Sequence, residues 1–194
     1  NLVQADVVFI STGHTSILDP AEYYSKALSE LTQDLCRNRL ICKAVADLDL
    51  DGIVMVLSDR RQHCEDLAAI LMDKHGIEAA VLTGQTKAHD RVEIIQGLEA
   101  GSIRVVVATG QLVGEGLDLP AITTMALATP VKFSGRLIQY IGRALRPAPG
   151  KDRALILDFI DDHGVFQASA RGREQVYKQQ GIRVVGDAQQ VGAA

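Results

Sequence analysis

Short runs of consecutive apolar residues alternate along this chain with longer stretches in which apolar residues recur every three or four positions. An uninterrupted apolar run indicates a strand that is buried on both faces, and the three-to-four spacing is typical of an amphipathic helix. Together they predict an α/β fold in which helices cover both faces of a parallel sheet. The strands that we expect are residues 53–58, 78–83, 104–108, 123–128 and 153–159.

The first 50 residues follow a different pattern, with one short β-rich run at 7–10 and then a long amphipathic segment that opens near Asp19. An aspartate before a proline suits the start of a helix, so we expect one long helix with a break. The chain then divides into an N-terminal strand-and-helix extension (1–50), the α/β core (51–185) and a weakly ordered tail (186–194).

Composition places the chain among ordinary globular domains, since 47% of its 194 residues are hydrophobic and 23% are charged. The net charge of −4 means that any contact with nucleic acid has to come from local basic groups. No apolar run approaches the length needed to span a membrane. The three cysteines form no CxxC pair, which fits a reducing, cytoplasmic setting. Because the chain begins with Asn1, we expect it to be part of a longer polypeptide.

Polar and basic residues follow the predicted strands at the edge of the sheet where their carboxyl ends meet. Ligands of open parallel sheets bind at that edge, and hydroxyl groups, backbone N–H groups and cations suit phosphate contacts. Loops of α/β proteins are in any case rich in Gly, Ser and Thr, so phosphate binding and plain loop structure both remain open. The candidate residues are Ser58, Arg60, Arg61, Thr83, Gly84, Lys87, Thr109 and Gly110.

The loop after residues 104–108 ends in a more specific pattern, Gly116-Leu117-Asp118. A glycine lets the backbone approach a ligand closely, and a carboxylate two residues later accepts hydrogen bonds from a ribose hydroxyl or orients an arginine. The alternative is a tight turn that Asp118 and Pro120 close without any ligand.

A predicted helix over residues 134–146 carries Gln139, Arg143 and Arg146 at positions i, i+4 and i+7, on the side opposite its apolar residues. Guanidinium groups bind phosphate oxygens in pairs and stabilise the charge that spreads over a transferring phosphoryl group. A solvated basic face near a helix C-terminus is the alternative. Pro147 places Arg146 at the very end of this helix.

Other kinds of site find less support in the sequence. Asp158, Asp161, Asp162 and His163 offer oxygen and nitrogen ligands at a strand end, so a metal-dependent hydrolase remains a rival reading, although we expect no metal site. The cysteines and histidines lack zinc spacing. The chain contains neither a GxxxxGK[ST] phosphate cradle nor an acidic DExx-type box for Mg²⁺.

Four segments together resemble the second RecA-like lobe of a superfamily 2 helicase. IVMVLSDRRQHCEDLA resembles motif IV, VLTGQTKAHDR the segment between motifs IV and V, VVVATGQLVGEGLDLP motif V, and QYIGRALRPAPGK motif VI. The resemblance covers about residues 52–161, in the family's order and spacing. The motif sequences GEGLDLP and QYIGRALRP resemble those of excision-repair and restriction-type DNA translocases more than those of DEAD-box RNA helicases, which usually have His in place of Gln139.

The resemblance implies a role for each matching position. Arg146 would be the arginine finger, Arg143 a second sensor of the ATP γ-phosphate, and Gln139 the link from that phosphate to the lobe interface. Gly116 and Asp118 would lie against the nucleotide. The positions that would follow the nucleic-acid backbone are Ser58, Thr83, Gly84, Thr109 and Gly110.

Taken together, the residues and the resemblance favour the C-terminal lobe of an ATP-dependent nucleic-acid helicase or translocase that acts on DNA rather than RNA. ATP and Mg²⁺ would be held mainly by an N-terminal RecA-like lobe of the same polypeptide, so the 194-residue chain alone would be inactive as an ATPase. The principal alternative is a non-catalytic RecA-like module that uses the same loops to bind nucleic acid or protein.

Overall fold

The computed structural model describes residues 3–19, 21–48, 52–115, 119, 122–132, 134–144 and 146–186. The predicted sites at Gly116 and Asp118 and the tail beyond Gly186 lie outside the described residues. Within the described part of the chain, no helix is both long enough and apolar enough to cross a membrane.

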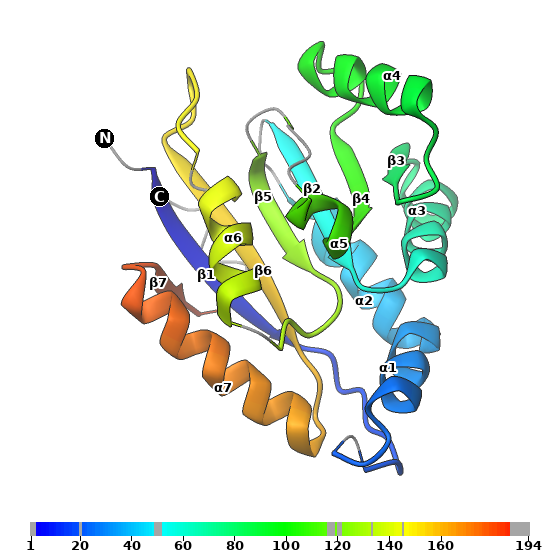
Figure 1. Cartoon of the computed structure of the whole chain (residues 1–194), viewed down its shortest axis with the longest axis vertical. Helices are drawn as coiled ribbons and strands as arrows, with labels where there is room; N and C mark the ends of the chain where they lie inside the picture. Colours follow the sequence, from blue (N-terminus) through cyan, green and yellow to red (C-terminus); the bar gives the residue numbers. More distant parts are fainter. Residues whose placement is uncertain are drawn as a thin grey trace.

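Among the described residues, one sheet of seven strands forms the centre of the fold, in the order β3-β4-β2-β5-β6-β1-β7, and every pairing between these strands is parallel. The parallel arrangement brings all the strand carboxyl ends to one edge, as the alternation of strands and helices predicted. Figure 1 shows the helices on both sides of this sheet. The strands are β1 (Gln4–Ser11), β2 (Ile53–Ser58), β3 (Ala79–Leu82), β4 (Val105–Thr109), β5 (Ile122–Leu127), β6 (Arg153–Ile160) and β7 (Arg183–Val185).

Two hydrophobic clusters, one on each face, hold the helices to the sheet. One cluster joins alternate strand residues such as Met55 and Val106 to α5, α6 and α7, and the other joins their neighbours Val54 and Val107 to α2 and α3. This alternation explains why the central strands read as continuous apolar runs. The helices are α1 (Tyr24–Gln33), α2 (Leu35–Ala46), α3 (Arg61–His75), α4 (Ala88–Glu99), α5 (Gly110–Gly114), α6 (Ser134–Ala144) and α7 (Gly164–Gln179).

The five strands predicted in the core are all present, with ends that shift by no more than a few residues. Two short elements were not predicted. One is β7, three residues that pair with β1, and the other is α5, a single turn of helix that begins and ends with glycine. A three-residue strand gives almost no periodic signal, and glycine disfavours a helix in sequence-based reasoning.

The first 50 residues are built into the domain, whereas we expected an extension added to the α/β core. β1 pairs along its whole length with β6 and forms the link between β6 and β7. Val7 and Val8 are completely buried, on opposite faces of the sheet. A boundary at residue 50 therefore separates elements along the sequence but not in space.

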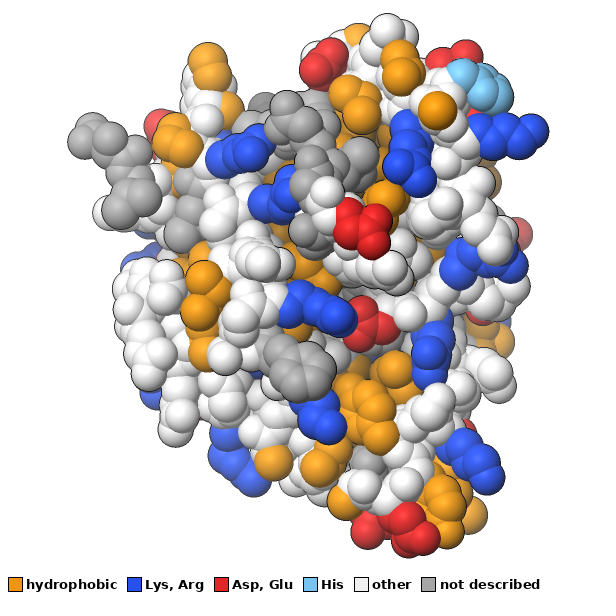
Figure 2. All heavy atoms as spheres, in the orientation of Figure 1, with side chains coloured by type: hydrophobic (Ala, Val, Ile, Leu, Met, Phe, Trp, Pro, Cys, Tyr) orange, Lys and Arg blue, Asp and Glu red, His pale blue; other side chains and the backbone are white. Residues whose placement is uncertain are grey.

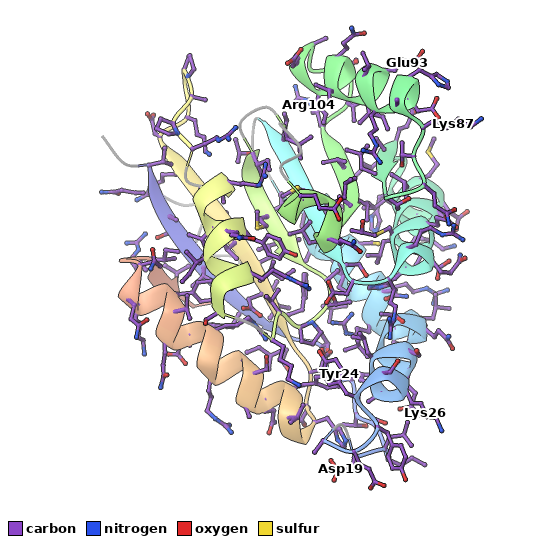
Figure 3. The ribbon with its side chains drawn as sticks, in the orientation of Figure 1. Asp19, Tyr24, Lys26, Lys87, Glu93 and Arg104 are labelled. Carbon is purple, nitrogen blue, oxygen red and sulfur yellow. The ribbon has the colours of Figure 1, made fainter. Side chains whose placement is uncertain are left out.

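The long N-terminal helix is interrupted, as predicted, and the break lies at Asp34. The side chain of Asp34 accepts a hydrogen bond of 3.1 Å from the backbone N–H of Arg37 and so caps the start of α2. The other helix of the pair begins later than expected, at Tyr24 rather than near Asp19. Figure 3 shows Tyr24 between α1 and the start of α7, where its ring packs against Phe166 at a centroid distance of 5.9 Å.

Candidate functional site

A groove of about 420 Å³ lies at the carboxyl ends of three neighbouring strands, β3, β4 and β2. It brings together residues that are far apart in sequence, because the parallel sheet collects these three strand ends at one edge. Three of the five positions predicted to bind nucleic acid, Thr83, Gly84 and Thr109, line it. The complete lining is Asp59, Arg61, Thr83, Gly84, Gln85, Thr109, Gln111 and Arg136.

The wall formed by the loop after β3 is fixed by its own hydrogen bonds. The backbone N–H of Thr83 donates to the hydroxyl of Thr86 at 2.9 Å, and the N–H of Gln85 donates to the hydroxyl of Thr83 at 3.3 Å. A Cβ atom on Gly84 would meet no other atom, so the backbone there is open to a ligand. Figure 3 shows Lys87, also a phosphate candidate, pointing outward at the start of α4.

Ser58 is placed differently from the other predicted contacts, because its side chain is only 1% exposed. Its hydroxyl is 2.8 Å from Nδ1 of His63 and accepts a hydrogen bond of 3.1 Å from the N–H of Arg60. The second ring nitrogen of His63 is 2.8 Å from Oδ1 of Asn38. Burial, and to a smaller degree the charge of Arg37, lowers the pKa of His63 to about 3. Ser58 therefore orders the loop from beneath the groove surface.

The fifth predicted position, Gly110, begins α5 and packs against α6. A Cβ atom at this position would overlap the hydroxyl of Tyr140 and lie 3.2 Å from Oδ1 of Asp59. Only glycine therefore allows α6 to approach the end of β4 this closely. The close approach joins the loop after β2, the start of α5 and the middle of α6 at one point beside the groove.

Helix α6 carries the predicted nucleotide-facing side chains. Gln139 is exposed and Arg143 is half-buried, whereas Leu137, Tyr140 and Ile141 of the same helix are buried in the core. Arg146 is exposed and lies beyond the last helical residue, Ala144, so the helix ends two residues earlier than predicted. Figure 2 shows Lys and Arg side chains across the face that α5 and α6 form, with acidic side chains between them.

Lys151 holds the segment after α6 in place, a role that sequence reasoning missed. Its ammonium group donates to the carbonyl oxygen of Ala144 and, at 2.9 Å, to that of Arg146. The carbonyl group of Ala144 is one that the end of a helix leaves without a partner. The side chain is almost buried, and burial lowers the pKa of Lys151 to about 8. The backbone of Arg146 is therefore fixed by a buried cation.

Two of the three acidic residues proposed for a metal-dependent hydrolase, Asp158 and Asp161, are bound by guanidinium groups. Asp158 accepts hydrogen bonds from Nε and Nη2 of Arg173 at 2.8 and 2.7 Å, and Asp161 accepts from Nε and Nη2 of Arg37 at 2.7 and 3.1 Å. Both carboxylates are buried, with exposed fractions of 0% and 1%. These carboxylate oxygens form buried hydrogen bonds within the core, and the positive charges of the two arginines oppose the approach of a metal cation.

Sequence comparison finds similarity to helicases. Residues 36–148 match the helicase conserved C-terminal domain. The chain is 32% identical over 146 residues to putative helicase 22 of Sulfolobus islandicus filamentous virus, which covers 75% of this chain and 26% of that protein. It is 30% identical over 142 residues to UvrABC system protein B of a Nostoc species, covering 71% of this chain and 20% of that protein. The chain thus spans about a quarter or less of the length of these relatives.

Structural comparison finds the same fold in solved helicase structures. The superposition on UvsW of phage T4 has a TM-score of 0.70 at 19% identity and covers 95% of this chain and 41% of that one. The C-terminal domain of the DEAD-box protein Dbp5 has a TM-score of 0.64 at 16% identity and covers 95% of this chain and 91% of that one. The second match pairs nearly the whole of both chains, which identifies the fold as a RecA-like C-terminal lobe.

Proposed function

The chain belongs to the helicase conserved C-terminal domain family within superfamily 2, and from that premise we propose that it is the second RecA-like lobe of an ATP-dependent DNA helicase or translocase. In this proposal the lobe supplies an arginine finger through Arg146 and grips one nucleic-acid strand in the groove. The N-terminal lobe of the same polypeptide holds ATP and Mg²⁺.

The observation that carries the proposal is the groove itself. Thr83, Gly84 and Thr109 meet there beside the guanidinium groups of Arg61 and Arg136. Open backbone, hydroxyl groups and two cations in one concave surface suit the sugar–phosphate backbone, and they read no base edges. We therefore expect binding that depends on salt and has little sequence preference. Gly110 and Ser58 support this surface through the packing and hydrogen bonds described above.

The nucleotide part of the proposal rests on α6 and the segment after it. Gln139 and Arg143 stand on the side of α6 that the core does not use, and Lys151 fixes the backbone of Arg146. A fixed backbone limits the positions that the Arg146 guanidinium has to sample, and charge stabilisation in phosphoryl transfer benefits when the arginine has less to reorganise. Gly116 and Asp118 would complete the nucleotide-facing side.

The preference for DNA rests on Gln139, which replaces the His usual in DEAD-box RNA helicases, and on the wording of GEGLDLP and QYIGRALRP. Closing and opening of the cleft between the two lobes during ATP turnover would move the protein along the strand. Because ATP would lie between the lobes, we propose that the isolated chain has no ATPase activity. We also propose a cytoplasmic location, from the unpaired cysteines.

A non-catalytic RecA-like module is the second candidate, because the groove alone would serve it equally well. The metal-dependent hydrolase is disfavoured, since Asp158 and Asp161 are bound by buried arginines. A Walker A lobe in the full-length polypeptide would decide between the first two readings.

The test is ATP hydrolysis by the full-length protein with Arg146→Ala. We expect turnover to fall by about 10³–10⁵-fold while ATP binding is largely retained, because the finger acts on charge that develops in the transition state. Arg146→Lys should not restore turnover, since an ammonium group cannot reproduce the planar fork. Arg171→Ala, a change at an exposed arginine of α7, is the matched control. Near-normal hydrolysis by Arg146→Ala, or robust hydrolysis by the isolated chain, would contradict the proposal.

A further inference from the structure

Two guanidinium groups line the groove from different helices, and different partners hold them. Arg61 at the start of α3 and Arg136 near the start of α6 have side chains of similar exposure, 46% and 43%. Arg61 donates to Gln85 and lies near Glu65, one turn along its own helix. Arg136 instead has its Nη1 atom 3.5 Å from Oδ1 of Asp59, which belongs to the loop after β2.

Asp59 is the residue that does not fit a surface built for phosphate. It is the only carboxylate that lines the groove in the described part of the chain. The N–H of Asp59 donates to the hydroxyl of Thr129 at 2.9 Å, so its backbone is fixed. Partial burial raises the pKa of this carboxyl, because its charged form is poorly solvated. Its 3.5 Å contact with Arg136 is longer than an ordinary charged hydrogen bond, so this pair exchanges partners easily.

A second donor lies close to the same carboxylate. The hydroxyl of Tyr140 is buried and has no hydrogen-bond partner among the described residues. It touches the position of a Cβ atom on Gly110, and Oδ1 of Asp59 lies 3.2 Å from that position. The hydroxyl and the carboxylate therefore face the same small space beside Gly110. A buried hydroxyl without a partner is unfavourable, so an acceptor that moves toward it is stabilised.

We propose that Asp59 exchanges Arg136 for the hydroxyl of Tyr140 when a backbone phosphate enters the groove, so that Arg136 transmits nucleic-acid binding to α6. The inference rests on the proposed function and adds the residues that couple nucleic-acid binding in the groove to ATP hydrolysis through α6. In the empty groove Asp59 neutralises Arg136. In the occupied groove Arg136 donates to the phosphate, and Asp59 accepts from Tyr140.

Because Arg136 belongs to α6, the exchange of partners also affects the residues of this helix that are proposed to face ATP. Arg136, Gln139 and Arg143 stand at i, i+3 and i+7, which places them along one side of the helix. The hydrogen bond from Arg136 to the phosphate and the new hydrogen bond at Tyr140 both involve side chains of this helix. Together they shift the residues proposed to face ATP. Arg61 contacts the same groove from α3, which carries none of those residues. The two arginines therefore bind alike and differ in coupling.

The experiment measures ATP hydrolysis by the full-length protein against the concentration of single-stranded oligodeoxythymidine, for Arg136→Gln and Arg61→Gln. Each variant loses one phosphate contact, so each should raise the half-saturating concentration and lower the slope of log affinity against log salt by about 0.7. Only Arg136→Gln should also lower the maximal stimulation at saturating DNA, by at least about fivefold.

Tyr140→Phe separates coupling from structure, because it removes one hydroxyl from a ring that stays buried. A hydroxyl with a purely structural role would lower the melting temperature when it is removed. We expect the melting temperature of Tyr140→Phe to be unchanged or higher, and its half-saturating DNA concentration to stay within about twofold of wild type. The maximal stimulation should nevertheless fall.

The outcomes distinguish this inference from the function beneath it. If wild-type hydrolysis responds to DNA and the two arginine variants keep the same maximal stimulation, the coupling role is wrong and the proposed function stands. Normal stimulation of Tyr140→Phe also overturns the exchange. If DNA does not stimulate the wild-type protein at all, both the inference and the proposed function fail.

Discussion

Arginine and aspartate meet at the carboxyl edge of the sheet in two regions, and the two meetings are built differently. Beside β2, Arg136 and Asp59 are 3.5 Å apart, with side chains 43% and 32% exposed. Beside β1 and β6, Arg37 and Asp161 are 2.7 Å apart, and both side chains are completely buried. Thr12 adds a hydrogen bond of 2.6 Å to the same carboxylate of Asp161. The same two residue types thus form a loose exposed pair in one region and a tight buried pair in the other.

Burial and pair geometry separate the polar residues at a strand end that hold the fold from those that are open to a ligand. A buried carboxylate with bidentate arginine contacts cannot exchange partners without exposing a charge to the core, which is strongly unfavourable. A half-exposed pair at 3.5 Å exchanges one partner for another at little cost. From sequence, both regions are strand ends with acidic residues. Burial alone assigns the groove to binding and the Arg37–Asp161 pair to structure.

The largest effect on stability is expected when one partner of the buried pair is removed. Asp161→Asn leaves the guanidinium of Arg37 buried without its counter-charge, so we expect the free energy of unfolding to fall by about 3–5 kcal/mol. Urea denaturation of the isolated chain measures it. The groove variant Arg61→Gln should change the same quantity by no more than about 0.5 kcal/mol, because that side chain is exposed.

A double replacement sharpens this test. Arg37→Met with Asp161→Leu removes both charges, and we expect it to be closer to the wild type than either single change. A single Asp161→Asn variant as stable as the wild type would show that the pair does not hold α2 to the sheet. The buried pair and the groove pair would then not differ in their contribution to the free energy of unfolding.

The second prediction concerns acid, through His63 beneath the groove. The pKa of His63 is about 3 in the folded protein, whereas a solvated histidine, as in the unfolded chain, has a pKa of 6.5. Between these pH values the unfolded chain binds a proton that the folded chain does not. The free energy of unfolding should therefore fall as pH is lowered from 6.5, by up to about 1.4 kcal/mol per pH unit.

Unfolding measured across this pH range on His63→Gln checks the prediction. The glutamine keeps a polar side chain that does not titrate, so its curve should be flatter than the wild-type curve. His75→Gln, at the exposed end of α3, should leave the wild-type slope unchanged. If both variants have the same slope as the wild type, His63 does not carry the acid sensitivity.

A smaller change in stability than at Asp161 is expected at Lys151. Lys151→Met removes the hydrogen bonds to the carbonyl groups of Ala144 and Arg146, so we expect the free energy of unfolding to fall by only about 1 kcal/mol. Hydrolysis of ATP by the full-length protein should fall by about tenfold, because the backbone of Arg146 is no longer fixed. Lys132→Met, at an exposed lysine above the ring of Tyr24, is the control. Normal turnover in Lys151→Met would remove this positioning role.

Much of the fold could be predicted from the sequence, because each central strand is buried on both faces and therefore appears as an uninterrupted apolar run. The predicted strand at 53–58 matches β2 residue for residue. The place of β1 could not be predicted, since its partner β6 lies about 150 residues along the chain. The pattern of a segment reports its own burial and says nothing of the strand that lies beside it.

Part of the candidate site could also be predicted from the sequence. Knowing that ligands bind at the carboxyl ends of parallel strands was enough to select Thr83, Gly84 and Thr109, which meet in the groove. The same rule selected Ser58, whose hydroxyl the structure buries against His63. Arg136 was missed because it acts through a contact with Asp59, 77 positions away. Lys151 was missed because it acts on backbone carbonyl groups, which no sequence motif marks.

A titration of the isolated chain with oligodeoxythymidine, followed through its backbone amide resonances, locates the surface that binds single-stranded DNA. We expect weak binding, with a Kd of about 10⁻⁴–10⁻⁶ M that rises with salt. The resonances that shift should be those of Thr83, Gly84, Thr109 and Gly110, while the amide of Asp161 stays unchanged. Shifts centred on Asp161, or binding that leaves the groove unchanged, would contradict the assignment of the exposed region to binding and the buried region to structure.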